Sequence, residues 1–159
     1  MMKDTKWDLN DIVLVPAEQS EISSRKECSP YYMFPNYHLV LPIMAAPMDT
    51  VVSIDNYEQY TRSGIIPCLP RGTDPRYLHY KQEKYFMSFS LCEIETTIKE
   101  FEEAGLKSNR EFDNYSFYKF KNVLIDIANG HMAKLVDIIK KIKTYWPYIN
   151  IMIGNIANP

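Results

Sequence analysis

The sequence has no hydrophobic run long enough to cross a membrane and no marked excess of charge. No apolar stretch approaches the roughly 20 residues that a spanning helix needs, and the first seven residues lack the apolar core of a signal peptide. Eighteen basic residues stand against twenty acidic residues, which gives a net charge of −2. This balance gives no reason to expect a nucleic acid or an anionic membrane as a partner.

Cysteine and glycine are also scarce. The three cysteines, Cys28, Cys68 and Cys92, are an odd number without the spacing of a metal site. We therefore expect no metal and reduced thiols in a cytoplasmic protein, with a catalytic or disulfide role as the alternative. Five glycines accompany ten prolines and twelve tyrosines. Aromatic residues gather at 31–37 and 115–120, which we expect to be surface segments whose rings pack onto the domain, or an interface.

What the sequence does contain is a series of short apolar runs that stop at polar turns. Runs of this kind predict buried strands, here at 39–46, 65–70, 85–92, 122–128 and 149–154. A further short strand is predicted within 7–15, ahead of Pro16. The length of 159 residues fits one domain.

Helical patterns separate these strands. The clearest one runs from 132 to 145, where Pro147 closes it. Its apolar side chains recur every three or four residues, at Met132, Leu135, Val136, Ile139 and Ile142. Shorter helices are predicted at 54–63, 75–84 and 94–104. Because strands and helices alternate, the predicted fold is α/β with a parallel sheet and right-handed crossovers.

The carboxyl ends of three predicted strands carry residues that could bind a ligand. Met48, Asp126 and Asn155 each lie where a strand finishes, which is where β/α proteins place their sites. Each residue also has a structural alternative. Met48 could fill the core, Asp126 could cap a helix or form a turn, and Asn155 could form a turn.

Four motifs together resemble the amino-terminal half of the catalytic barrel in the IMP dehydrogenase/GMP reductase family. They are residues 10–16 with Ser24-Arg25, residues 45–51, residues 126–131, and Gly154-Asn155. Their order and spacing match that family over nearly all of residues 8–158. The resemblance implies a partial TIM (β/α)8 barrel, in which residues 1–159 hold about five of the eight β/α units and no CBS domain.

The resemblance also implies contacts to a purine mononucleotide. Ala46, Met48 and Asn155 match positions that contact the nucleotide in the family. Ala46 stands where dehydrogenases often have serine, so its contact is expected to be weaker or made by the backbone alone.

Other matching positions imply an NADP or NAD cofactor. Asp126, Ile127 and Ala128 match the segment that meets its nicotinamide-ribose end, where a carboxylate accepts hydrogen bonds from hydroxyl or amide donors. Ser24-Arg25 resemble a cofactor contact given across a subunit interface, where a guanidinium suits a phosphate. Arg71 follows the second strand of the sheet, where the family has a basic residue.

The family's catalytic machinery has no counterpart in this sequence. Its nucleophile is a cysteine in a Gly-Ser-x-Cys-x-Thr loop after the sixth strand, and Gly-rich turns after the seventh and eighth strands hold the phosphate. No cysteine here matches that loop, so we expect no catalytic residue in the chain. We expect an amino-terminal piece of a barrel: a truncated or split product, a fragment that needs a second chain, or a remnant. The missing carboxyl-terminal half or self-association would complete it, and the family forms homotetramers.

The implied function is purine nucleotide oxidation or reduction. The Asp-Ile-Ala-Asn-Gly-His motif at 126–131 and the lack of room for CBS domains favour GMP reductase, which converts GMP to IMP and ammonia with NADPH. The Ala46-Pro47-Met48 motif has the form found in dehydrogenases, so IMP dehydrogenase, which converts IMP to XMP with NAD, is one alternative. The other is a catalytically inactive half-barrel that binds nucleotide or a partner chain.

Overall fold

The chain consists of two compact units, residues 1–30 and residues 31–159. The computed structural model describes residues 10, 13, 15, 18–19, 21–34, 38–78, 84–105 and 117–156. In the first unit a short 3-10 helix, η2 (Arg25–Glu27), is capped by Ser24, whose hydroxyl accepts the Lys26 N–H at 3.3 Å. Most of the strand predicted within 7–15 lies outside the described residues.

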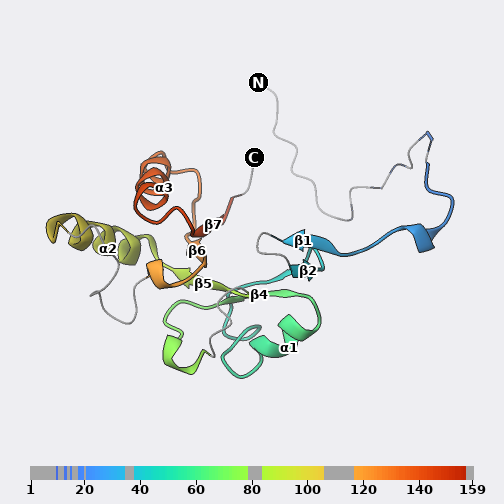
Figure 1. Ribbon diagram of the computed structural model, residues 1–159, viewed down its shortest axis with the longest axis horizontal. Helices are drawn as coiled ribbons and strands as arrows, with labels where there is room; N and C mark the ends of the chain where they lie inside the picture. The colour runs from blue at the N-terminus through green and yellow to red at the C-terminus, as the bar shows by residue number, and fades with distance from the viewer. Residues whose placement is uncertain are drawn as a thin grey trace. The chain divides into compact units, whose positions relative to one another are not determined.

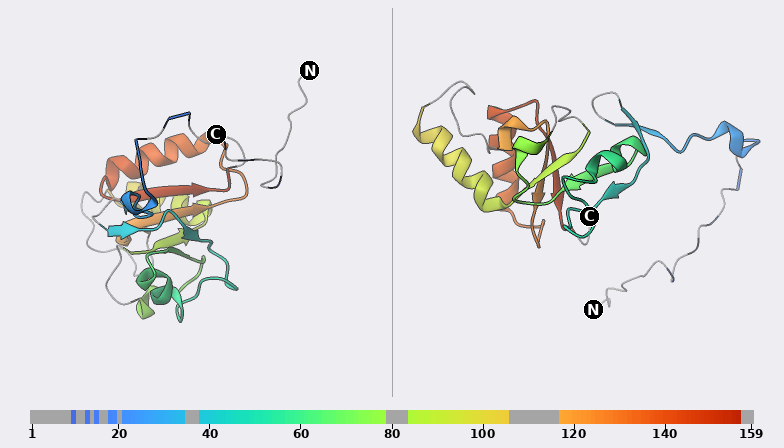
Figure 2. Two further views of the ribbon diagram at one scale, coloured as in Figure 1. Left: turned by 90° about the vertical axis from the view of Figure 1, so that its right-hand side faces the viewer. Right: turned by 90° about the horizontal axis from the view of Figure 1, so that it is seen from below.

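Five parallel strands in sequence order form the sheet of the second unit (Figure 1). They are β3 (Met44–Ala45), β4 (Ile66–Leu69), β5 (Phe86–Phe89), β6 (Asn122–Asp126) and β7 (Asn150–Gly154). The sheet curls into a half-barrel with α1 (Tyr57–Arg62), α2 (Leu91–Glu103) and α3 (Lys134–Tyr145) flanking it (Figure 2). The predicted partial α/β barrel is therefore confirmed. No helix among the described residues is long and apolar enough to cross a membrane.

Side chains along the strands alternate between two apolar clusters. On β6, Val123 and Ile125 belong to the large cluster beneath the helices, whereas Leu124 belongs to a smaller cluster with residues of β4 and β5. Alternation of this kind follows from the two-residue period of a strand. The smaller cluster therefore occupies the concave face of the half-barrel, with Ile66, Cys68 and Phe86 beside Leu124.

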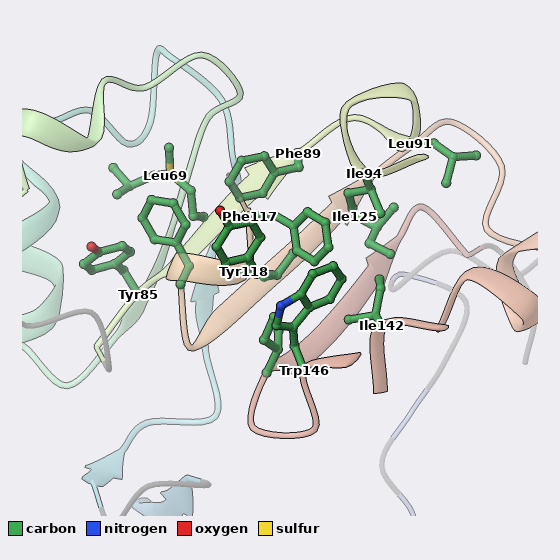
Figure 3. Packing of buried hydrophobic residues seen from close by; sticks show 14 of the residues in the cluster. Leu69, Tyr85, Phe89, Leu91, Ile94, Phe117, Tyr118, Ile125, Ile142 and Trp146 are labelled. Atoms are coloured by element: carbon green, nitrogen blue, oxygen red, sulfur yellow. The ribbon is translucent and has the colours of Figure 1, made fainter. Parts of the chain in front are cut away.

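Aromatic side chains fill the large cluster between α2, α3 and the segment before β6 (Figure 3). Trp146 is fully buried there, with its ring stacked on Tyr118 at 5.3 Å between centroids. Phe117 and Phe120 are 1% and 3% exposed. The aromatic residues that begin at 117, in η4 (Phe117–Lys119), are thus part of the core rather than a surface layer.

The helices follow their sequence signals with shifted ends. α2 begins at Leu91, three residues before its predicted start, because Ser90 and Glu93 form a reciprocal capping box. α3 covers most of the predicted 132–145, but its buried face is Leu135, Ile138 and Ile142, and Val136 is exposed. Instead of a helix over 75–84 there is a 3-10 turn, η3 (Pro75–Tyr77), and residues 79–83 lie outside the described part.

The first predicted strand, 39–46, is wrong as a single element. Its beginning pairs as β2 (His38–Val40) with β1 (Tyr32–Phe34) in an antiparallel hairpin, and only β3 joins the parallel sheet. Pro42 lies between β2 and β3 and has no N–H for a continuous ladder. The Leu41 N–H instead donates to the Gly64 carbonyl at 2.7 Å, just before β4.

Candidate active-site rim

The loops that follow the five strands lie along one edge of the half-barrel, because parallel strands have their carboxyl ends on the same side. Met48 lies in the loop after β3, and Arg71 lies in the loop after β4. Asp126 is the last residue of β6, and Asn155 directly follows β7. Four residues predicted from sequence to bind a ligand thus occupy one rim.

An ion pair joins two of these predicted residues across the end of β5. The Arg71 Nε lies 3.1 Å from an Asp126 carboxylate oxygen, and the two side chains are 54% and 28% exposed. Asp126 is therefore held by a cation from two strands away and still reaches solvent. It does not cap α3, whose N-cap position is Ala133 without a side-chain cap, so the helix-cap alternative is wrong.

Backbone hydrogen bonds fasten the loops after β6 and β7 to each other. The Ile127 N–H donates to the Gly154 carbonyl at 2.7 Å, and the Asn155 N–H donates to the Ile127 carbonyl at 2.5 Å. The Gly130 N–H donates to the Asn155 carbonyl at 2.8 Å. Ile127 is half-buried, whereas Ala128 and Asn155 are exposed beside it.

Gly130 is the sterically critical residue of these loops. A Cβ built on it would lie 2.5 Å from Ile156 Cγ1 and 3.0 Å from the Asn155 carbonyl oxygen. We expect Gly130→Ala to lower the free energy of unfolding by about 1–3 kcal/mol, as overpacking does, in urea denaturation. Gly154→Ala is the matched control, since nothing lies within 4 Å of its added Cβ. Equal stability of the two variants would contradict the close packing of Gly130.

The loop after β3 turns sharply and presents Met48 to solvent. The Met48 N–H donates to the Ala46 carbonyl at 2.8 Å, and its own carbonyl accepts the Val51 and Val52 N–H groups at 2.8 and 2.9 Å. The Met48 side chain is 55% exposed, so the alternative that it fills the core is wrong. Ala46 is exposed as well.

A cavity of about 300 Å³ lies between this loop and the loop after β4. Its lining residues are Asp49, Val52, Ser53, Ile54, Pro70, Thr73 and Asp74. Asp74 accepts hydrogen bonds from the Arg76 guanidinium and from the Arg76 backbone N–H, which lower the pKa of its carboxyl. The cavity adjoins the predicted binding residues on both sides, because Met48 precedes Asp49 and Arg71 follows Pro70.

Ser24 and Arg25 belong to the first unit, where both are exposed. Their predicted contact with a cofactor across a subunit interface stays a prediction.

Sequence reasoning missed one polar residue of the concave face. Ser88, on β5, is 1% exposed, and its hydroxyl has no hydrogen-bond partner in the described part of the chain. It pairs in register with Leu124, two residues before Asp126. The sequence signal that could have identified Ser88 is a serine inside an otherwise apolar strand. Across the described ranges, no group of three or more His, Cys, Asp or Glu could hold a metal ion.

Over 96% of its length, the chain aligns with curated proteins that are named GMP reductase. The GMP reductase of Streptococcus equi subsp. equi is 28% identical over 153 residues, and that of Streptococcus pyogenes is 27% identical over 153 residues. The GMP reductase of Staphylococcus carnosus is 26% identical over 160 aligned positions. The chain is similar to GMP reductases.

This similarity covers only part of each relative. The chain spans 44–45% of the length of these GMP reductases, less than half of each. No family model matches the chain. Similarity over almost the whole chain agrees with the family suggested by the sequence motifs.

Proposed function

We propose that this chain forms the amino-terminal part of the barrel of a GMP reductase, which converts GMP to IMP and ammonia with NADPH. The observation that carries the proposal is the ion pair between Arg71 and Asp126 at the rim, in the segment expected to meet the cofactor. The similarity to GMP reductases over 96% of the chain supports the same reaction.

The rim residues suit the nicotinamide-ribose end of the cofactor. Asp126 keeps a carboxylate partly exposed, so it can accept hydrogen bonds from ribose hydroxyls or an amide. Arg71 orients that carboxylate, and the adjacent Ile127 is fixed by backbone bonds to Gly154 and Asn155, with Ala128 next to it in the chain. When bound, NADPH supplies the hydride for the reduction.

The purine nucleotide would lie between the loops after β3 and β7. Met48 offers an exposed thioether side chain for apolar contact with a base, and Ala46 offers its backbone. Asn155 offers an exposed amide that can both donate and accept. Ser24 and Arg25 would reach the cofactor of a neighbouring subunit in a homotetramer.

Completion of the barrel would come from further parallel strands. Among the described strands, β3 and β7 are the two edges of the sheet, and an edge strand can extend the ladder. The catalytic cysteine and the phosphate-binding turns would be supplied with those strands, by a carboxyl-terminal half or by a partner chain.

Two assays test this function. With GMP, the 159-residue chain alone should oxidise no NADPH. The barrel completed by the carboxyl-terminal half or the partner chain should oxidise NADPH with GMP. The same completed barrel should not reduce NAD with IMP. Asp126→Asn should weaken NADPH binding by the completed barrel about tenfold, the size of one hydrogen bond to a charged group. Glu100→Gln is the control, because Glu100 is exposed on α2. Reduction of NAD with IMP, or unchanged NADPH affinity in Asp126→Asn, would refute the proposal.

A further inference from the structure

The cavity between the loops after β3 and β4 has an apolar floor and a polar mouth. Val52 and Pro70 are buried in its lining, whereas Asp49 is exposed and Ser53 and Thr73 are half-buried. Its volume of about 300 Å³ is at the lower limit of small-molecule sites, which extend from ~300 to ~1,000 Å³. A group of the size of a sugar ring fits this space better than a whole nucleotide.

The two carboxylates of the cavity differ in what they can bind. Both oxygens of Asp74 accept hydrogen bonds from Arg76, at 2.9 Å from its backbone N–H and at 2.6 to 3.1 Å from its guanidinium. No side-chain partner of Asp49 occurs in the described part of the chain. Asp49 is therefore the acceptor that is open to a ligand.

The two hydroxyl groups of the cavity have complementary capacities. The Ser53 Oγ accepts the Asp55 N–H at 3.3 Å, which leaves its own hydrogen free to donate. The Thr73 Oγ1 donates to the Pro70 carbonyl at 2.8 Å, which leaves its lone pairs free to accept. With Asp49, the cavity thus offers two acceptors and one donor.

The two acceptors and one donor of the cavity suit a neutral ligand group whose hydroxyls both donate and accept hydrogen bonds. An anion would face the Asp49 charge, and of the six to eight oxygen ligands that a divalent cation such as Ca²⁺ takes, the free groups of the cavity supply only a minority. The buried Val52 and Pro70 provide apolar contact for the carbon face of a ring. Vicinal hydroxyls on a sugar ring meet all of these conditions.

We propose that this cavity is a separate binding site for the vicinal hydroxyls of a ribose, with Asp49 as their acceptor. The choice of a nucleoside as the ligand rests on the proposed function, whereas the choice of a diol rests on the groups that line the cavity. The base then lies outside the cavity, over the adjoining loops.

The test compares two probes, adenosine and 2′,3′-dideoxyadenosine, by calorimetric titration of the full 159-residue chain. Adenosine should bind about tenfold more tightly, because only its diol can donate to Asp49. Asp49→Asn should reduce this preference for adenosine, because a neutral amide oxygen is a weaker acceptor than a carboxylate, and should leave the dideoxyadenosine affinity unchanged. Glu100→Gln, an equal change of charge on α2, should alter neither affinity. Equal thermal melting of Asp49→Asn and Glu100→Gln establishes that both variants are folded.

Several results would overturn the proposal. They are equal affinity for the two probes, no binding of adenosine, an unchanged preference in Asp49→Asn, and displacement of adenosine by Ca²⁺. Loss of the preference in Asp126→Asn instead would place the diol at the rim ion pair. Failure of the Asp49 test leaves the NADPH result for Asp126→Asn intact, so the two proposals can fail separately.

Discussion

Trp146→Ala is expected to lower the free energy of unfolding by about 3–5 kcal/mol, the cost of removing a large buried aromatic side chain. Trp146 is fully buried and its ring lies 4.9 to 5.3 Å from the rings of Phe101, Phe117 and Tyr118. A loss of this size is a large part of the ~5–15 kcal/mol that stabilises a typical domain. Urea denaturation followed by circular dichroism measures it.

Two variants serve as controls for this prediction. Trp146→Phe keeps a ring in the cluster and should lose less stability than Trp146→Ala. Val136→Ala lies on the same side of the sheet in α3, but Val136 is 54% exposed, and its effect should stay within about 0.5 kcal/mol. If Trp146→Ala were no more harmful than Val136→Ala, the packing of α2 and α3 around Trp146 would be wrong.

Cys68 is expected to react with iodoacetamide about a thousandfold more slowly in the native protein than in concentrated urea, near pH 8. Burial on the concave face raises the pKa of the Cys68 thiol from 9.0 to about 12, because a buried thiolate loses its hydration. The thiolate is the reactive form, and its fraction below the pKa falls tenfold for each pH unit. Peptide mapping by mass spectrometry gives the three rates.

The other cysteines provide an internal comparison for this experiment. Cys28 and Cys92 are exposed, and all three thiols are free. In concentrated urea the three rates should become similar, since burial alone distinguishes Cys68. Labelling of native Cys68 at the rate of Cys92 would mean that the concave face opens readily to solvent.

The sequence predicted those elements whose signals are local. The four strands β4 to β7 and the helix α3 have short apolar runs or a helical period, and both arise from neighbours along the chain. The predicted face of α3 was partly wrong, because Ile138 rather than Val136 is buried. A stripe of apolar residues leaves the rotation of a helix uncertain by one position when several adjacent residues are apolar.

Elements that depend on distant partners were missed. The hairpin of β1 and β2 has only three residues in each strand, and its pairing is set by contacts rather than by a two-residue period. The rings of residues 117, 118 and 120 were expected to pack onto the domain from a surface segment, but their full burial was not expected, because their partner Trp146 lies far along the chain. Tertiary packing decided both features.

The candidate site likewise combines features with local sequence signals and features that depend on tertiary packing. Motifs placed Met48, Asp126 and Asn155 at strand ends, and parallel pairing then brings all strand ends to one rim. The ion pair of Arg71 with Asp126 required the position of β5 between their two strands. The isolated hydroxyl of Ser88 likewise required the full packing of the concave face.

The backbone hydrogen bonds that join the loops after β6 and β7 affect which residues of the rim can be substituted. Main-chain groups carry these bonds, so they survive most changes of side chain at Ile127, Ala128 and Asn155. Substitutions at those three positions can therefore change ligand preference without changing the path of the backbone. Gly130 is the exception, since any larger residue there collides with its neighbours. Substitutions at 127, 128 and 155 should accordingly leave the backbone path unchanged, whereas a larger residue at 130 should alter it.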